Sequence, residues 1–306
     1  MRNFTFKGLF LTAVFMLLGC LSIQAADDDL ITKQITVKLD KAGTLPDKIA
    51  SSEMYKITNL KIIGEINGTD FRMIREMAGR DYRGDVTEGN LSVLDLSEAK
   101  IVEGGDYYYS SFTDYKVYTS NDEIGEYAFH DCSGLTSLTL PAGISEIGDF
   151  AFSDCSGLTS LTLPAGISEI GERAFQVCSG LTSLNLPVGI TSIGECAFWY
   201  CSGLASVYVY AEKVPKIGED VFKYCDAKKC ILYVPKGTYD DYWLSDFGYF
   251  ENIVEFDATG IDKTTTSTNV EEVSRYSVNG QRLVGPTKGL NIVKYSDGSV
   301  KKVVVQ

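Results

Sequence analysis

The residues best suited to acid–base chemistry are His130, the only histidine in the chain, and the carboxylate of Asp131 beside it. A histidine and a carboxylate in contact can move a proton, but neighbours in sequence need not face each other. The positions that align with this pair in later repeats are Ser153-Asp154, Gln176-Val177 and Trp199-Tyr200, so the site is variable. The chain also has no phosphate-binding glycine loop and no nucleophile elbow. We therefore expect no enzyme, no catalytic residues and no cofactor.

Cysteine is the second reactive residue type, and five of the eight cysteines recur at a regular spacing. These are Cys132, Cys155, Cys178, Cys201 and Cys225. Side chains that repeat in this way line one column and point the same way, which predicts small buried hydrophobic residues rather than a disulfide framework. One bridge stays open as an alternative, either Cys225 with Cys230 or Cys196 with a neighbour. We expect no metal site, because no Cys-x-x-Cys motif occurs.

Acidic residues also recur at a regular spacing, each two positions after an isoleucine. The set is Glu126, Asp149, Glu172, Glu195 and Glu219. A solvated edge is the expected role of this acidic column, and weak Ca²⁺ binding is the alternative.

A repeat positions all of these residues. It begins at Ile124, Ile147, Ile170 and Ile193, a period of 23 residues, and again at Ile217 after one inserted residue. Such a period indicates a stacked array. One unit cannot bury enough apolar surface to offset about 1–2 kcal/mol of backbone entropy per residue, so neighbouring coils must cover each other. Each unit contains a short strand that ends at a proline without a free amide, which predicts one parallel sheet along a solenoid.

These repeats resemble the leucine-rich repeats of the BspA type, which are found on bacterial surfaces. The matching segments are IGEYAF, IGDFAF, IGERAF and IGECAF, each followed by CSGL and by LxLP or a near variant. Val207 and Val209 depart from the pattern, and the fifth unit is degenerate. The resemblance implies a leucine-rich-repeat solenoid of about seven coils, with repeats over 124–237. It also implies an adhesion protein, because relatives are associated with matrix proteins such as fibronectin and fibrinogen.

The N-terminal region predicts export and a cap. Residues 1–26 have a basic start, an apolar run and a small-residue end, which is typical of a secretory signal peptide. The segment that ends at Cys20 also resembles a lipoprotein box, so lipidation of Cys20 is the alternative. Residues 27–123 are expected to form an N-terminal cap of irregular repeats, with a helix that is capped by Thr69 or Asp70 and ends near Ala78.

An insertion inside one coil, from roughly Val102 to Glu123, is rich in tyrosine. It contains Tyr107, Tyr108, Tyr109, Tyr115 and Tyr118. Aromatic loops on a rigid scaffold often bind partners. The alternative is that these rings fold back over the first regular coil.

The C-terminal region predicts a cap, a linker and a separate tail. Residues 231–235 form the last expected strand, and 238–257, with Tyr242, Trp243 and Phe247, are expected to pack over the final coil. Residues 258–272 are a polar linker. Residues 273–306 predict a small antiparallel β segment with two tight turns. SVNGQRL, KGLNIV and the Lys-Val-Val end resemble a type IX secretion sorting domain, which implies recognition by the secretion machinery; a β segment without a sorting role is the alternative.

Outward positions on the repeat strands form two columns. One consists mostly of serine, and the other runs through Lys61, Asp95, Thr139, Thr162, Asn185, Tyr208 and Tyr233. We predict a binding site that combines the second column from Thr139 onward with the tyrosine-rich insertion. The alternative is that these small polar residues are merely solvated.

Net charge limits the choice of partner. The formal charge is −13, which disfavours nucleic acid and anionic lipid. The sequence therefore predicts a monomeric, exported, adhesin-like protein that binds an extracellular protein resembling a matrix glycoprotein. The alternative is a glycan-binding protein that captures polysaccharide.

Overall fold

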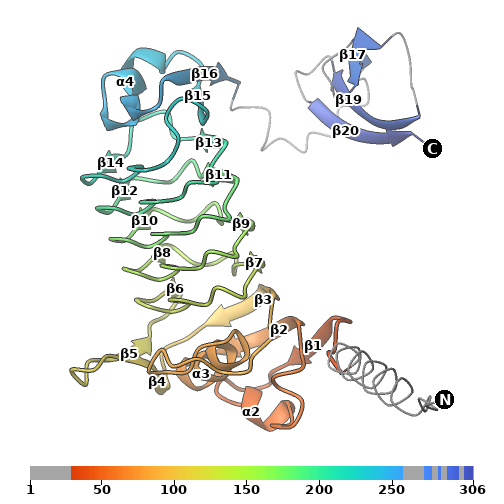
Figure 1. The fold of residues 1–306 in the computed structure, drawn as a ribbon, viewed down its shortest axis with the longest axis vertical. Coiled ribbons are helices and arrows are strands. Elements are labelled where there is room, and N and C mark those ends of the chain that lie inside the picture. Colours follow the sequence, from red (N-terminus) through yellow and green to blue (C-terminus); the bar gives the residue numbers. More distant parts are fainter. Residues whose placement is uncertain (1–28, 258–271, 278–281, 284–287, 296–299, 306) are drawn as a thin grey trace, which may run out of the picture.

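A computed structural model describes residues 29–257, 272–277, 282–283, 288–295 and 300–305. The expected signal peptide 1–26, with Cys20, and the expected linker up to residue 271 lie outside the described residues. Between residues 29 and 257 the chain forms a stack of coils with a cap at each end (Figure 1).

The N-terminal cap consists of three parallel strands, two helices and a hairpin. In chain order these elements are β1 (Ile35–Lys38), α2 (Leu45–Lys48), β2 (Asn59–Ile66), α3 (Gly68–Met77), β3 (Val93–Ile101), β4 (Gly104–Ser110) and β5 (Lys116–Thr119). β1, β2 and β3 pair in parallel, whereas β4 and β5 form an antiparallel hairpin. β3 then pairs with the first repeat strand, so the cap and the repeats share one sheet.

Helix α3 is capped by Asn67, not by the predicted Thr69 or Asp70. The side chain of Asn67 accepts a hydrogen bond from the Thr69 amide at 3.1 Å, and the Asp70 carboxylate accepts one from the Asn67 amide at 2.9 Å. This is a capping box in which two free amides are satisfied reciprocally. The buried Asp70 carboxylate also accepts from the amides of Gly43 and Leu45, which fixes the segment leading into α2.

Each repeat contributes two short parallel strands. The first set is β7 (Ser137–Thr139), β9 (Ser160–Thr162), β11 (Ser183–Leu186), β13 (Ser206–Val209) and β15 (Ile231–Pro235). The second set is β6 (Glu123–Ile124), β8 (Glu146–Ile147), β10 (Glu169–Ile170), β12 (Ser192–Ile193) and β14 (Lys216–Ile217). The prediction of a single parallel sheet was therefore wrong, because two-residue strands are too short to leave an alternating pattern in the sequence.

The two sets lie on different walls of the coil stack (Figure 1). Equivalent residues of neighbouring coils pair with each other, as Leu138 does with Leu161. Thr159 donates its hydroxyl to the Thr136 carbonyl, 23 residues earlier, at 3.0 Å. The ladder of the first wall is interrupted between β9 and β11, so β11, β13 and β15 continue in a separate sheet.

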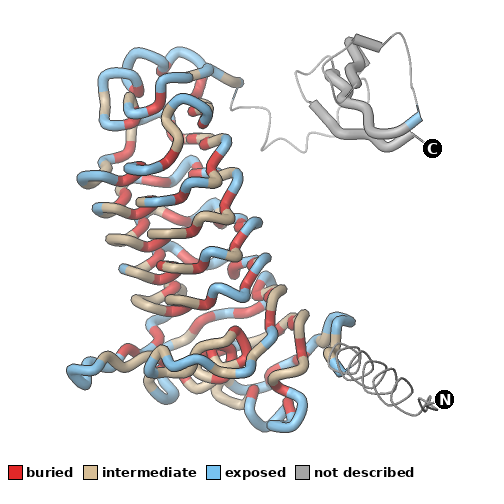
Figure 2. Tube along the Cα trace, viewed as in Figure 1, coloured by how far each residue is buried: buried red, intermediate tan, exposed pale blue. Residues whose placement is uncertain are grey.

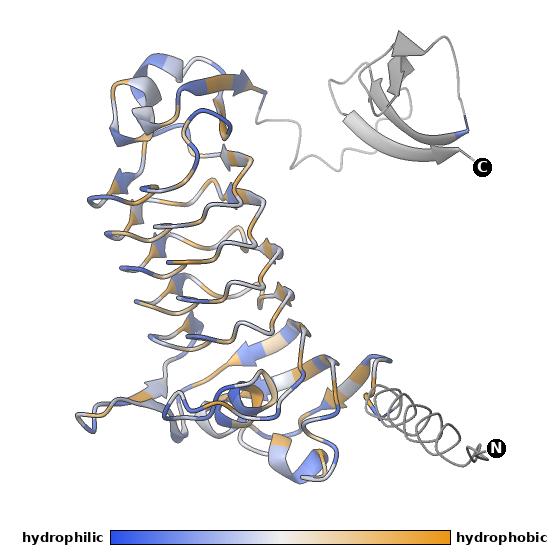
Figure 3. Ribbon diagram, in the orientation of Figure 1, coloured by the Kyte–Doolittle hydropathy of each residue, from blue (hydrophilic) through white to orange (hydrophobic). Residues whose placement is uncertain are grey.

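Buried and hydrophobic residues recur in every coil between the walls (Figures 2 and 3). The core there is a column of aromatic rings and thiols. One phenylalanine per coil stacks on the next, with ring centroids 5.0–5.6 Å apart. These are Phe129, Phe152, Phe175, Phe198 and Phe222. The recurring cysteines lie beside them and are buried, as predicted, and the Cys155 thiol donates to the Phe129 carbonyl at 3.0 Å. All seven described cysteines are free, so the alternative Cys225–Cys230 bridge is absent.

The repeat glycines permit close contact between coils rather than unusual turns. The residues with positive φ in this turn are not glycines, as Arg173 at 51° and Val177 at 59° show. A Cβ at Gly171 would lie 2.6 Å from the Asp149 amide nitrogen, and one at Gly194 would lie 2.5 Å from that of Glu172. Hydrogen is the only side chain that fits between coils at this spacing.

The C-terminal cap contains a strand that the sequence did not predict. α4 (Tyr239–Trp243) and the 3₁₀ helix η1 (Asp246–Tyr249) are followed by β16 (Asn252–Phe256), which pairs in parallel with β15. β15 is therefore not the last strand of the stack. Tyr242, Phe247 and Phe250 are buried over the last coil, whereas the indole of Trp243 is largely exposed.

The tail strands are β17 (Glu272–Ser277), β18 (Arg282–Leu283), β19 (Gly289–Tyr295) and β20 (Val300–Val305). They pair antiparallel, in the order β18, β17, β19, β20. In the parts of the chain that the structure describes, none of the helices has the length and apolar character needed to cross a bilayer.

Candidate functional site

The predicted outward column lies on the first wall in two consecutive segments. Lys61 of β2 lies beside Asp95 of β3, which lies beside Thr139, and Thr139 lies beside Thr162. Beyond the interruption of the ladder, Asn185, Tyr208 and Tyr233 follow one another in the same way. We call the five residues Thr139, Thr162, Asn185, Tyr208 and Tyr233 the repeat face. The first three side chains are exposed, so their hydroxyl and amide groups are available to a partner.

Tyrosine side chains form the C-terminal end of the repeat face. The rings of Tyr208 and Tyr233 stack with centroids 4.3 Å apart and planes 4° apart. Phe256 of β16 lies edge-on to Tyr208 at 5.9 Å and to Tyr210 at 5.2 Å. Desolvation by burial raises the pKa of Tyr208 above its ordinary value, so its hydroxyl stays protonated at neutral pH and can donate a hydrogen bond. The sequence predicted the pair but not the contribution of Phe256, which belongs to the unpredicted strand.

Charged groups are confined to the N-terminal end of the row. The Lys61 ammonium lies 2.8 Å from the Glu98 carboxylate and 3.0 Å from that of Asp95. Hydrogen bonds to Glu98 and Asp95 raise the pKa of Lys61, so it remains protonated and paired. From Thr139 to Tyr233 the repeat face itself carries no ionisable group other than the two phenols. A partner that binds there does not have to desolvate a full charge.

Tyr108 of the tyrosine-rich hairpin is a core residue and cannot belong to a binding surface. Its side chain is 1% exposed, its ring lies 5.5 Å from that of Phe71, and its hydroxyl donates to the Glu126 carbonyl at 2.8 Å. Burial raises the pKa of this phenol well above its ordinary value. The prediction of Tyr108 as a binding residue was wrong, because alternation along β4 directs the middle tyrosine inward.

The other hairpin tyrosines lie partly over the first coil. Tyr109 stacks on Tyr127 at 4.4 Å, and the Tyr115 hydroxyl donates to the Glu126 carboxylate at 2.7 Å. Tyr107 is half-buried, with its ring 6.2 Å from that of Tyr118, which is 51% exposed. The hairpin thus covers the first regular coil and also exposes aromatic surface.

The hairpin and the repeat face lie on different walls. The contacts of Tyr109 and Tyr115 are with Glu126 and Tyr127, which directly follow β6 of the second wall, whereas Thr139 belongs to β7 of the first (Figure 1). The sequence-based prediction treated the two groups as one site. The structure does not bring them together.

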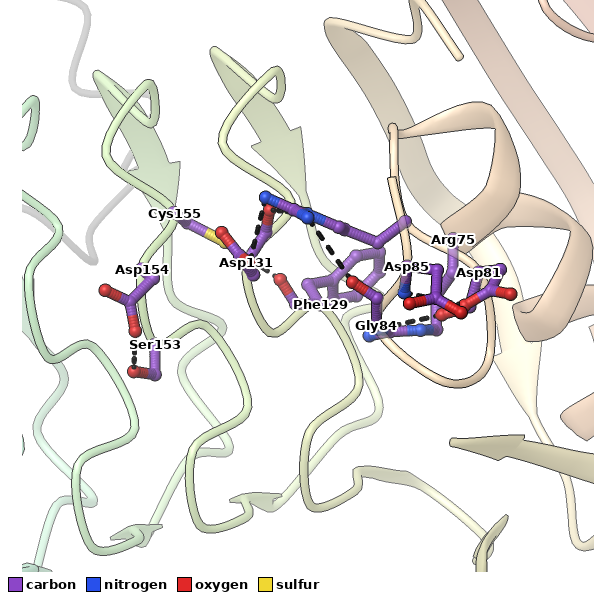
Figure 4. A network of polar contacts seen from close by, with 10 residues as sticks. Arg75, Asp81, Gly84, Asp85, Phe129, Asp131, Ser153, Asp154 and Cys155 are labelled. Atoms are coloured by element: carbon purple, nitrogen blue, oxygen red, sulfur yellow. Dashed lines mark hydrogen bonds and ion pairs between the residues drawn. The ribbon is translucent and has the colours of Figure 1, made fainter. Parts of the chain in front are cut away.

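His130 and Asp131 do not form a catalytic dyad. The Asp131 carboxylate pairs with the Arg80 guanidinium at 2.9 Å, and the buried Nδ1 of His130 has no hydrogen-bond partner among the described residues. Burial lowers the pKa of His130, with the nearby Arg75 charge acting in the same direction. Figure 4 shows Asp131 beside the Asp81–Asp85 loop of the N-terminal cap.

The acidic column does not form a metal site in the structure. A separate row of acidic residues on the second wall consists of Glu123, Glu146 and Glu169, which are direct neighbours. Burial raises the pKa of Glu146, and the charges of Glu123 and Glu169 add to the effect. Within the described ranges, no group of three or more acidic, histidine or cysteine side chains is placed to hold a metal ion.

An exposed aromatic cluster on the far side of the coils was missed by sequence reasoning. It consists of Trp199, Tyr200 and Tyr224, with ring centroids 4.7–5.4 Å apart. Tyr200 and Tyr224 are 44% and 52% exposed. Trp199 and Tyr200 align with His130 and Asp131, so the change from polar to aromatic residues along this column was a signal that could have identified the cluster.

Comparison with known proteins identifies one repeat family. Residues 100–229 match the BspA type leucine rich repeat region, in six copies. No curated protein matches the chain. A solved leucine-rich repeat protein from Bacteroides capillosus ATCC 29799 is 22% identical, with a TM-score of 0.29, over 43% of this chain and 87% of that one. One from Bacteroides ovatus ATCC 8483 is 18% identical, with a TM-score of 0.34, over 74% of this chain and 66% of that one.

A third similar structure is a leucine rich cell surface protein from Faecalibacterium prausnitzii A2-165. It is 19% identical, with a TM-score of 0.34, over 66% of this chain. The match spans 51% of that protein, about half of its length. The family match is thus confined to residues 100–229 of the present chain.

Proposed function

We propose that this leucine-rich-repeat protein is exported, has no enzymatic activity and binds an extracellular protein through the repeat face. The observation that carries the proposal is an uncharged row of hydrogen-bonding side chains that ends in the stacked pair Tyr208–Tyr233. The chain as a whole is strongly acidic, with a formal charge of −13. A neutral strip on such a surface is suited to a contact that loses little hydration energy.

Export is part of the proposal. The signal-like segment 1–26 supports passage across the inner membrane, and the resemblance of residues 273–306 to a type IX sorting domain supports transfer across the outer membrane. The match to BspA type repeats supports a role in protein interaction at the cell surface. Anchoring through a lipidated Cys20 is the alternative to free secretion.

Glycan capture is a second candidate, and the aromatic end of the face favours it. Tyr208, Tyr210, Tyr233 and Phe256 form a cluster beside the exposed amide of Asn185. Aromatic rings stack against the apolar faces of sugars, and the amide can bond to their hydroxyls. Both candidates use the same residues, so ligand chemistry must separate them.

Removing glycans from the ligand separates the two candidates. The full chain would be tested for binding to immobilised matrix glycoproteins, such as fibronectin, before and after enzymatic deglycosylation. We expect binding to survive, because backbone and side-chain groups of the partner would occupy the repeat face. Loss of binding would transfer the protein to the glycan-capture class, and no binding to either form would contradict the proposal for this group of ligands.

A further inference from the structure

In the turn that follows each second-wall strand, backbone amides of one coil donate to carbonyls of the next coil. The Tyr127 amide donates to the Asp149 carbonyl at 3.0 Å, and the Phe129 amide donates to the Ala151 carbonyl at 2.7 Å. The same pair of bonds recurs in each later coil up to those from Cys196 and Phe198. The carbonyls at the start of the first coil therefore have no donor among the repeats, and the amides of the last coil have no acceptor among them. Both ends need partners from outside the repeats.

The N-terminal cap provides partners for the carbonyls. The Tyr108 hydroxyl donates to the Glu126 carbonyl at 2.8 Å, and the Arg75 guanidinium donates to the carbonyls of Tyr127 and Ala128 at 2.7 and 3.1 Å. Glu126 and Ala128 occupy the positions that accept amides in the later coils. The buried hairpin tyrosine and the buried arginine thus supply the hydrogen-bond donors that a preceding coil would otherwise provide.

The C-terminal cap leaves the corresponding amides incomplete. Tyr249 contacts one end of the last coil. Its hydroxyl donates to the Cys225 carbonyl at 2.7 Å, and the hydroxyl oxygen itself lies within reach of the Tyr224 amide. The amides of Asp220 and Phe222 align with those of Tyr127 and Phe129. Within the described part of the chain, neither has a hydrogen-bond acceptor.

A carbonyl is also left unpaired at this end. In each earlier coil the isoleucine of the second-wall strand accepts a bond from the glycine of the next coil, as Ile193 does from Gly218 at 2.9 Å. No described amide reaches the Ile217 carbonyl in this way. Its side chain is partly exposed, whereas its equivalents Ile170 and Ile193 are 2% exposed. The edge of the last coil thus presents one acceptor, two donors and an apolar side chain.

This edge lines a pocket of about 690 Å³ between the last coil and the C-terminal cap. We call it the terminal-coil pocket; its lining includes Ile217, Glu219, Asp220, Phe222, Asp246 and Tyr249. Three of these residues are acidic. The one base in the lining, Lys223, already pairs with Asp220 at 2.7 Å. The pocket therefore favours a positively charged occupant.

We propose that the terminal-coil pocket binds an extended, positively charged peptide segment of a partner protein, which adds to the stack as a further coil. Its carbonyls accept from the amides of Asp220 and Phe222, and one of its amides donates to the Ile217 carbonyl. Lysine or arginine side chains lie against Glu219 and Asp246. Strand addition of this kind draws affinity from main-chain hydrogen bonds and specificity from side chains.

The occupant is a partner peptide rather than a second copy of this chain. The matching edge of another copy, the carbonyls of its first coil, is already satisfied by Tyr108 and Arg75. A second copy would also bring a formal charge of −13 toward an acidic pocket. This inference goes beyond the proposed function and is independent of it, because the pocket and the repeat face share no residue.

Binding of a synthetic peptide of alternating valine and lysine, with its terminal charges blocked, to the full-length chain tests the proposal. We expect it to bind, and to bind at least tenfold more tightly than the same peptide with N-methylated backbone amides, which has equal charge but cannot add as a strand. Hydrogen exchange at the amides of Asp220 and Phe222 should slow on binding. Equal affinity for the two peptides, or no binding, would overturn the proposal.

Matched charge variants locate the site. Glu219→Lys should weaken binding of the valine–lysine peptide at least tenfold, and Glu172→Lys, at the same position two coils earlier, should leave it unchanged. Equal losses would mean attraction to the acidic surface in general. Self-association that disappears in Glu219→Lys would overturn the proposal by making a second copy the occupant. Tyr208→Ala should leave peptide binding intact, which separates this result from failure of the repeat face.

Discussion

At the scale of single residues, the repeat contains positions fixed by packing and positions that are free to vary. Cysteine and phenylalanine fill the core column, where burial decides their chemistry. Desolvation raises the pKa of the Cys132 thiol to about 11 and those of Cys155 and Cys178 well above their ordinary value. A buried thiol stays protonated and unreactive because the thiolate is the nucleophile. Cys196 lies outside the column and is only partly buried.

Alkylation should therefore label Cys196 first. At pH 8 in the native state, iodoacetamide is expected to modify Cys196, with the other six described cysteines unreactive until the chain is unfolded. Raising the pH toward 9 should speed the reaction at Cys196, because more of its thiol is ionised. Cys132 should remain inert, since about one in a thousand of its thiols is ionised at pH 8. Peptide mass spectrometry measures both rates, and comparable labelling of Cys178 would contradict the packing described.

Glycine at a fixed repeat position offers a test with an internal control. A Cβ at Gly157 would lie 2.2 Å from the Ser133 carbonyl oxygen, whereas at the equivalent Gly134 of the first coil the nearest atom is 3.8 Å away. We expect Gly157→Ala to destabilise the protein by about 2–3 kcal/mol through overpacking. Gly134→Ala should be neutral, or stabilise by about 0.5 kcal/mol through the unfolded state. Denaturant unfolding compares them, and equal effects would contradict the role of close approach between coils.

At the scale of elements, the regular coils were predictable and their ends were not. The inward positions Leu161 and Leu163 were evident because identical spacing recurs in every unit. The second wall was missed because Glu146–Ile147 is too short for periodicity to register. Tyr108 and Tyr109 are adjacent tyrosines with different environments, which sequence alone does not distinguish. Arg75 gave no signal, since its partners are carbonyls 52 and 53 residues later.

Arg75 should be the residue on which the N-terminal cap most depends. It is fully buried, and it reaches the carbonyls of Asp81, Tyr127 and Ala128 at once. Arg75→Met should cost about 3 kcal/mol, because buried carbonyls lose their donors. Arg75→Lys should not restore stability, since a single ammonium group cannot donate to all three carbonyls at once.

Arg80→Met is the matched control for the arginine at the cap. Arg80 pairs with the Asp131 carboxylate at 2.9 Å and also donates to the carbonyls of Asp131 and Gly84, but it is partly exposed. Water can therefore replace some of these bonds, and its loss should cost about 1–2 kcal/mol, less than that of the fully buried Arg75. Thermal unfolding of the two variants gives the comparison. Equal losses of stability in the two variants, or full stability in Arg75→Lys, would show that the Arg75 guanidinium is not needed to satisfy the carbonyls of the first coil.

At the scale of the whole molecule, the stack separates three surfaces. The repeat face follows the first wall, the tyrosine hairpin covers the start of the second, and the terminal-coil pocket opens where the second wall ends. Each coil touches mainly its neighbours, so surfaces at different positions along the solenoid can bind partners independently. The outward columns could be derived from the repeat, whereas their separation from the hairpin required the structure.

The most direct test of the proposed function is matrix-glycoprotein binding by two pairs of aromatic variants in the full-length chain. The first pair, Tyr208→Ala with Tyr233→Ala, removes the aromatic end of the repeat face. The second pair, Tyr200→Ala with Tyr224→Ala, removes exposed rings of the same type from the far side of the coils. We predict at least a tenfold loss of affinity for the first pair and no change for the second. Unchanged binding in the first pair, or an equal loss in both, would contradict recognition through the repeat face.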